Sequence, residues 1–173
     1  MLVSLFQLQI NITLTPFNGV KVMFIALKLI MQKTKIGHLT ITNESLVIKR
    51  EGKSIKLHRV KALMDFNDVE KGQKGGFVEK IENIEDLAWV RCGAKINGLS
   101  RLRGSLELFQ NAKLLGEVDV DGDCEFHGNS IIYGSFMIRE QVIVKDNVSI
   151  RGLGRIVGDV TISGNFTSIS RLV

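Results

Sequence analysis

Histidines are the side chains best suited to general-base catalysis near neutral pH, because an imidazole can take a proton from a hydroxyl or an amine there. The sequence has three: His38, His58 and His127. His127 lies in the run CEFHGN, next to a glycine, so its side chain is expected to point outward beside a chain reversal. It is the candidate catalytic base if the protein is an acyltransferase. His58 lies in an alternating segment and is expected to be structural, and no surrounding motif gives His38 a role.

Acidic and glycine-rich stretches could suggest a metal or phosphate site. Four carboxylates follow one another at every second position: Asp119, Asp121, Asp123 and Glu125. The paired-glycine repeat of calcium-binding β-helices does not accompany them, so a solvated face is the better interpretation. The Gly75-Gly76 pair lacks a following Lys-Ser/Thr, which favours a tight turn over a phosphate loop. We therefore expect no metal site and no cofactor.

Charge and cysteine usage exclude several classes of function. The 173 residues include 23 Lys and Arg against 18 Asp and Glu, and the net charge is +5. Bases and acids are mixed along residues 32–173, whereas a nucleic-acid-binding surface gathers its bases on one face, so nucleic-acid binding is not expected. The two cysteines predict neither a disulfide framework nor a metal cluster. Cys124 should be buried, Cys92 should face outward, and a reducing, cytoplasmic compartment is the expected location.

A six-residue repeat determines the fold. From Ala88, thirteen hexads follow without insertion, beginning AWVRCG, AKINGL, SRLRGS and LELFQN and ending VTISGN. The third position is Val, Ile, Leu or Phe in all thirteen, the first is small or apolar, and the fifth is Gly in nine. First and third positions share one side of a strand, and glycine permits the corner that follows. Each hexad is thus predicted to form one short strand and one corner.

The sixth position shows how many hexads close a turn. Asparagines recur there every eighteen residues, at Asn111, Asn129, Asn147 and Asn165. Three hexads per turn would stack these amides in one hydrogen-bonded column. The same spacing would place bulky Phe136 beside Gly154 inside, and would align Arg103, Asp121 and Arg139, and Arg101 with Asp119, outside. The sequence predicts an all-β, three-sided parallel β-helix of about four turns over 88–173, left-handed by analogy with hexapeptide proteins.

Two segments precede these hexads. Residues 32–87 break the pattern, alternate around a predicted hairpin turn at 50–53, and are expected to cap the first turn of the β-helix. Trp89 should pack beneath this cap. Residues 1–31 form an apolar extension that contains Asn, Pro and Lys and lacks the features of a signal peptide. Upstream sequence translated in frame, a packed extension and membrane contact remain alternatives for it; membrane association is the least expected of the three.

The cap contains a motif with a family resemblance. Residues 57–90 resemble the segment that leads into the β-helix of the bacterial YdcK-like proteins, which are hexapeptide-repeat acyltransferases. The matching residues are Asp65, Phe66, Asp68, Val69, Gly72, Gly75, Gly76, Val78 and Trp89. The resemblance implies a capped β-helix and an acyl-coenzyme A-dependent trimer. It supplies no catalytic residue that can be matched, and relatives often have longer β-helices.

These observations favour a non-enzymatic structural or protein-interaction scaffold. Its partners, or further copies of the chain, would bind the flat faces or the C-terminal edge of the β-helix. The expected interaction surface is Arg101, Arg103, Asp119, Asp121, Ile131, Tyr133 and Arg139. The alternative is a trimeric acyltransferase that uses acyl-coenzyme A and His127. A third hypothesis is a phage or mobile-element protein that binds and blocks a host protein.

Overall fold

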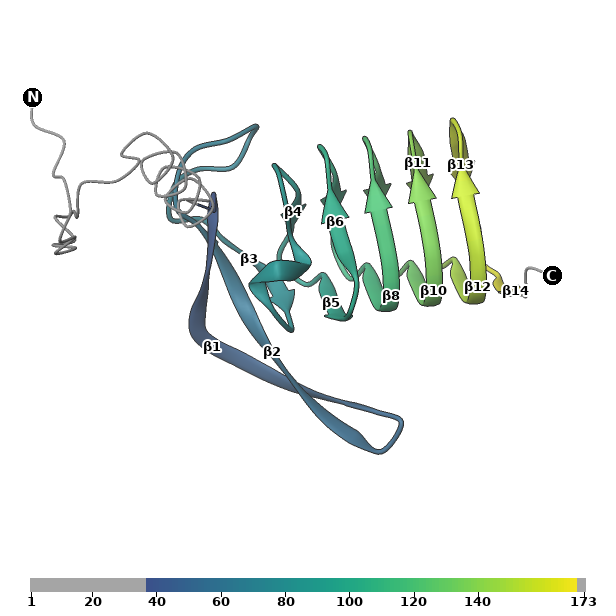
Figure 1. Ribbon diagram of the computed structural model, residues 1–173, viewed down its shortest axis with the longest axis horizontal. Coiled ribbons are helices and arrows are strands. Elements are labelled where there is room, and N and C mark those ends of the chain that lie inside the picture. Colours follow the sequence, from purple (N-terminus) through teal and green to yellow (C-terminus); the bar gives the residue numbers. More distant parts are fainter. Residues whose placement is uncertain (1–36, 171–173) are drawn as a thin grey trace, which may run out of the picture. The chain divides into compact units, whose positions relative to one another are not determined.

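The computed structural model describes residues 37–170, and these form a β-hairpin followed by a parallel β-solenoid of about five turns (Figure 1). The hairpin consists of β1 (Leu39–Arg50) and β2 (Lys53–Ala62). The solenoid contains β3 (Lys74–Val78), the 3-10 turn η1 (Ile81–Asn83), β4 (Trp89–Val90), β5 (Lys95–Gly98), β6 (Arg101–Arg103), β7 (Glu107–Leu108), β8 (Lys113–Asp121), β9 (Glu125–Phe126), β10 (Ile131–Arg139), β11 (Val142–Val144), β12 (Ser149–Val157), β13 (Val160–Ile162) and β14 (Thr167–Ser170). The all-β class predicted from the repeat is confirmed.

Successive turns are in register at a spacing of eighteen residues. In β10, Ile132 pairs with Leu114 of β8 and with Ile150 of β12, and every pair along these strands is parallel. Each first- and third-position side chain from Ala88 to Ile150 is buried. Phe136 pairs with Gly154, so the bulky side chain has the smallest residue beside it, as the spacing predicts.

Each turn has three sides, which we call face 1, face 2 and face 3. Face 1 is formed by β3, β5 and the first halves of β8, β10 and β12, and face 2 by β6 and the second halves of the same three long strands. Face 3 is the five-stranded sheet of β4, β7, β9, β11 and β13. Interior side chains of all three faces belong to one hydrophobic core.

Corners are sharp because the fifth residue of the hexads adopts positive φ, except in the first hexad, where the sixth residue Gly93 does so (98°). This holds at every fifth position from Gly98 to Gly164, including three that are not glycine: Gln110 (51°), Glu140 (72°) and Asp146 (66°). Successive turns approach closely here, since a Cβ added at Gly134 would lie 1.9 Å from the carbonyl oxygen of Gly152. Glycine at most corners therefore serves both backbone conformation and packing between turns.

The asparagine column is present at another corner. Asn111 Nδ2 donates to Asn129 Oδ1 (3.1 Å), Asn129 donates to Asn147 (2.8 Å), and Asn147 donates to Asn165 (2.5 Å). This is the ladder that the eighteen-residue spacing predicts.

The solenoid begins earlier than the hexads predict. Val78 pairs with Ile96 and Ile84 with Leu102, in both cases eighteen residues apart and parallel. Asp86 has the positive φ (52°) of a fifth-position corner. The boundary placed at residue 88 is therefore wrong: residues 76–87 supply two sides of an additional turn. The sequence does not reveal this turn because its corner positions are not glycine and its segment IENIEDL is charged.

The hairpin turns at the predicted residues but covers more than the end of the solenoid. Arg50 pairs with Lys53, and both turn residues, Glu51 and Gly52, have positive φ, as a two-residue hairpin of matching twist requires. β2 extends the face 1 sheet by pairing antiparallel with β3. The hairpin tip then reaches the outside of face 1, where Arg50 donates to Asn97 (3.3 Å). The segment is thus a cap and also a cover for one face.

Gly75 and Gly76 do not form the predicted turn. They lie in β3, are buried, and do not have positive φ. A Cβ on Gly75 would lie 2.4 Å from the Val90 carbonyl oxygen, and one on Gly76 would lie 2.4 Å from that of Ala94. The pair is structural because the backbone of the next turn leaves no space for a side chain.

Two predictions on the N-terminal region have different outcomes. Trp89 is fully buried and contacts Phe66 of the cap edge-on, with ring centroids 5.8 Å apart, so its predicted packing is confirmed. The apolar extension 1–31 and residues 32–36 of the predicted cap lie outside the described residues. Within residues 37–170, no helix has the length and apolar character needed to cross a membrane.

Candidate functional site

Face 3 positions the candidate base His127. β9 ends at Phe126, and the next residue points outward because strand side chains alternate. His127 Nε2 lies 2.8 Å from Glu125 Oε2, and the imidazole stacks on the Phe109 ring of the preceding turn with a centroid distance of 4.2 Å. An imidazole that donates from Nε2 to a carboxylate keeps Nδ1 as a proton acceptor. The pair lies in a shallow depression lined also by Gln110, Gly128, Ile143, Lys145 and Asp146.

On the part of face 3 that is nearer the cap, several side chains form a column in which each contacts the next. Arg91 lies over the Phe109 ring (5.1 Å), donates to Glu107 (2.7 Å), and makes two hydrogen bonds with Asp68 of the cap. The hydrogen bond from Arg91 lowers the pKa of the Asp68 carboxyl below its ordinary value. The column fastens the cap to the solenoid, which is a structural role.

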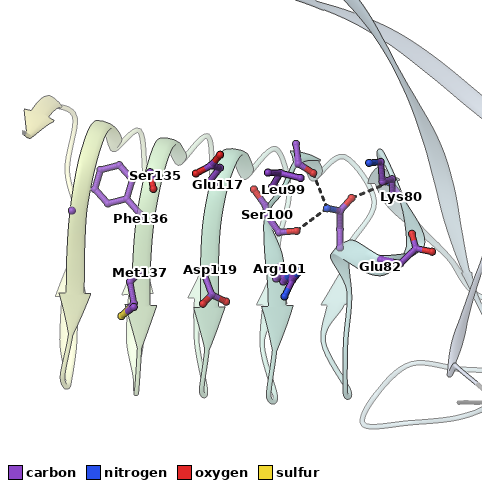
Figure 2. A pocket seen from close by; sticks show the side chains of 13 residues that line it. Lys80, Glu82, Leu99, Ser100, Arg101, Glu117, Asp119, Ser135, Phe136 and Met137 are labelled. Atoms are coloured by element: carbon purple, nitrogen blue, oxygen red, sulfur yellow. Dashed lines mark hydrogen bonds between the residues drawn. The ribbon is translucent and has the colours of Figure 1, made fainter. Parts of the chain in front are cut away.

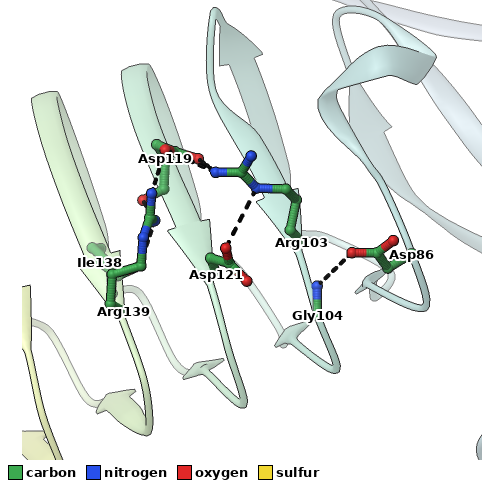
Figure 3. Close-up of polar contacts among 7 residues, drawn as sticks. All are labelled: Asp86, Arg103, Gly104, Asp119, Asp121, Ile138 and Arg139. Carbon is green, nitrogen blue, oxygen red and sulfur yellow. Dashed lines mark hydrogen bonds and ion pairs between the residues drawn. The ribbon is translucent and has the colours of Figure 1, made fainter.

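Face 2 carries the charged part of the predicted interaction surface (Figure 3). Arg103 makes two hydrogen bonds with the Asp119 carboxylate (2.8 and 3.0 Å), and Arg139 donates to the same group (2.6 Å). Arg103 is also 3.7 Å from Asp121. The predicted alignment of Arg101 with Asp119 is confirmed, but the two side chains do not form an ion pair. The two are neighbours in register, but Asp119 is held by the other two arginines, and Arg101 has no ion pair with any residue from 37 to 170.

A depression of about 720 Å³ follows the corner between face 1 and face 2 (Figure 2). We call it the corner groove. One row of side chains, at sixth positions, contains Leu99, Glu117 and Ser135; the other, at second positions, contains Arg101, Asp119 and Met137. Between the rows lie first-position residues whose side chains point inward, so the floor is mainly backbone. Leu99 and Met137 are 66% and 38% exposed, so each wall of the groove carries one exposed apolar side chain.

The outside of face 1 is not the free apolar surface that Tyr133 and Ile131 predict. The Tyr133 hydroxyl donates to Glu51 of the hairpin turn, and the Arg50 guanidinium lies 4.6 Å from the Tyr133 ring centroid. The hydrogen bond from Tyr133 lowers the pKa of the Glu51 carboxyl. Ile131 is only partly buried. Tyr133 therefore belongs to an internal contact, which a sequence pattern cannot show because its partner is 82 residues away.

Cysteines and carboxylates add no metal site to these faces. Cys124 is buried and Cys92 is exposed, as predicted, and both are free thiols. Burial raises the pKa of the Cys124 thiol. Among residues 37–170 there is no group of three His, Cys, Asp or Glu side chains placed to hold a metal ion.

The motif that resembles YdcK-like proteins has structural roles throughout. Phe66 contacts Trp89 and also the ring of His38, whose Nε2 lies 3.2 Å from the Ala88 carbonyl oxygen. Asp65 Oδ1 accepts a hydrogen bond from the Lys71 backbone, and Gly72 has φ of +90°. Together with Asp68, Gly75 and Gly76 these residues build the cap and its junction. None of them lies in the His127 depression or in the corner groove.

The described residues thus define the class of protein as a capped parallel β-solenoid, with the hairpin on part of face 1 and the cap on part of face 3. Neither a comparison with protein-family models nor one with curated proteins finds a match to this chain.

Proposed function

We propose that this protein is a non-enzymatic scaffold that binds another protein through face 2 and the corner groove. The single observation that supports it most is the exposure of Leu99 and Met137 beside an ordered array of charges on a flat surface. The hairpin contacts part of face 1, and the cap contacts the N-terminal part of face 3. Apolar residues rimmed by charges are typical of protein interaction sites. An inhibitor that binds and blocks a host protein is one form of this function.

A variant-dependent capture experiment tests the proposal. The full chain, its Met137→Asp variant and its Lys145→Asp variant are each used to capture proteins from cells of the source organism. We expect one stoichiometric partner that the wild type and Lys145→Asp retain and that Met137→Asp loses at least tenfold. Lys145 is exposed on face 3, so it controls for a change of surface charge. A partner retained equally by all three proteins would contradict a role of face 2.

Acyl transfer is a second candidate, favoured by the contact of His127 with Glu125 and by the resemblance of the cap to hexapeptide-repeat acyltransferases. In that function His127 would accept a proton from an acceptor hydroxyl or amine, and Glu125 would hold the imidazole. Acetyl-coenzyme A should then raise the melting temperature, and His127→Ala should abolish acetyl transfer without lowering the melting temperature of the free protein. No thermal shift at millimolar acetyl-coenzyme A would contradict this candidate.

A further inference from the structure

We propose that the corner groove binds an α-helical segment of the partner, laid along the solenoid axis with one ridge of small or apolar side chains between the two rows. This inference rests on the proposed function and names the chemistry of the partner. The ridge would carry a basic residue on the side of Glu117 and an acidic residue on the side of Arg101.

The spacing of the turns favours a helix. Neighbouring strands in the solenoid are about 4.8 Å apart, so three steps along the groove cover about 14 Å. Helix residues at i, i+3, i+7 and i+10 lie on one face and rise about 4.5, 10.5 and 15 Å, close to the successive turns. An extended peptide presents same-side residues about 6.7 Å apart, and it would be out of step by about 6 Å after three turns.

The width of the groove agrees with a single ridge. Its walls are second- and sixth-position residues that flank one inward-pointing residue, so they are separated by two residues of extended chain, about 7 Å. A whole helix of about 10 Å diameter does not enter such a space, but one row of its side chains does. Phe136 is 4% exposed beneath the rows, and Gly154 beside it has no side chain that could fill the floor.

Exposed charges of both signs line the groove, among them Lys80 and Glu82 at its N-terminal end. Glu117, on one wall, is exposed and has no ion pair with another described residue. On the other wall Asp119 is already neutralised by Arg103 and Arg139, which leaves Arg101 exposed and without an ion pair in this part of the chain. A helix with a basic residue facing Glu117 and an acidic residue facing Arg101 therefore matches the central part of the groove.

A peptide selection tests the proposal on the full-length chain. A phage-displayed library of random 16-residue peptides is selected on the wild type, with counter-selection on Met137→Asp. We expect enriched peptides whose apolar residues recur at i, i+3, i+7 and i+10, which become helical on binding, and which bind Met137→Asp and Leu99→Asp at least tenfold more weakly. Lys145→Asp should bind them as the wild type does.

Charge reversal provides the decisive comparison. Glu117→Lys should weaken binding of a selected peptide at least fivefold, and exchanging the facing basic residue of that peptide for Glu should restore it. Enriched peptides that alternate with a period of two and still require Met137 would overturn the helix while leaving the proposed function intact. Peptides that bind Met137→Asp and Leu99→Asp as well as the wild type, or a selection without enrichment, would overturn both. Melting temperatures of all variants confirm that each is folded.

Discussion

Replacing Glu140 by glycine should stabilise the protein, although it removes a side chain. Glu140 occupies a corner with φ of 72°, where an L-residue costs about 1–2 kcal/mol relative to glycine. Its carboxylate has no hydrogen bond or ion pair with another described residue, so little is lost with it. Glycine also increases the entropy of the unfolded chain, and this effect cancels about 0.4–1 kcal/mol of the gain in stability. We expect a net increase of about 0.5–1 kcal/mol in the free energy of unfolding.

Urea titration measures this change, and two other corners calibrate it. Asp146→Gly should be nearly neutral, because Asp146 Oδ2 accepts a hydrogen bond from the Gly164 backbone (3.0 Å) that glycine cannot make. Gly134→Ala should be strongly destabilising, because its Cβ would overlap the Gly152 carbonyl oxygen. The Glu140→Gly melting temperature should rise by roughly 1–4 °C. A loss of stability in Glu140→Gly would refute the assignment of a strained left-handed backbone to the Glu140 corner.

Three further changes test other parts of the structure. Asn147→Ala should lose about 1–2 kcal/mol by urea titration, because it removes two bonds of the amide ladder; an unchanged midpoint would show that the ladder contributes nothing. Asp68→Asn should remove a pH-dependent contribution to stability. Since Arg91 depresses the folded-state pKa, that contribution is present above the unfolded pKa and is lost as pH falls through the folded pKa. Wild type and variant should therefore differ at pH 7 and converge in acid, and a constant difference would contradict the assignment. Ile132→Asp should cost more than about 4 kcal/mol and unfold the domain, whereas exposed Lys145→Asp should retain the wild-type circular dichroism spectrum and melting temperature.

The register of the solenoid was predictable because it depends on local spacing. Apolar residues at first and third positions indicate which side chains point inward. Asparagines at the sixth position of every third hexad indicate which residues of successive turns lie side by side. Residues 76–87 were missed because only one of their two corners has positive φ, and that corner is Asp86 instead of glycine. The repeat can thus continue where its most visible residue type is missing.

The surface was less predictable because its contacts join distant segments. Nothing near Tyr133 indicates that the hairpin turn at Glu51 will reach it. Asp119 likewise pairs with arginines on diagonal positions of the neighbouring turns, because long side chains reach past their nearest neighbour in register. The sequence predicted which residues face outward, but which of them remain accessible depends on how the hairpin folds back.

Site-specific photocrosslinking in cells determines whether a partner protein binds at face 2 and the corner groove. Benzoylphenylalanine is incorporated in place of Leu99 on the corner groove, Ile143 on face 3 or Lys56 on the hairpin, and cells of the source organism are irradiated. We expect a covalent adduct with one protein from the Leu99 position and none from the Ile143 or Lys56 positions. An adduct formed from Ile143 but not from Leu99 would contradict binding at face 2 and the corner groove.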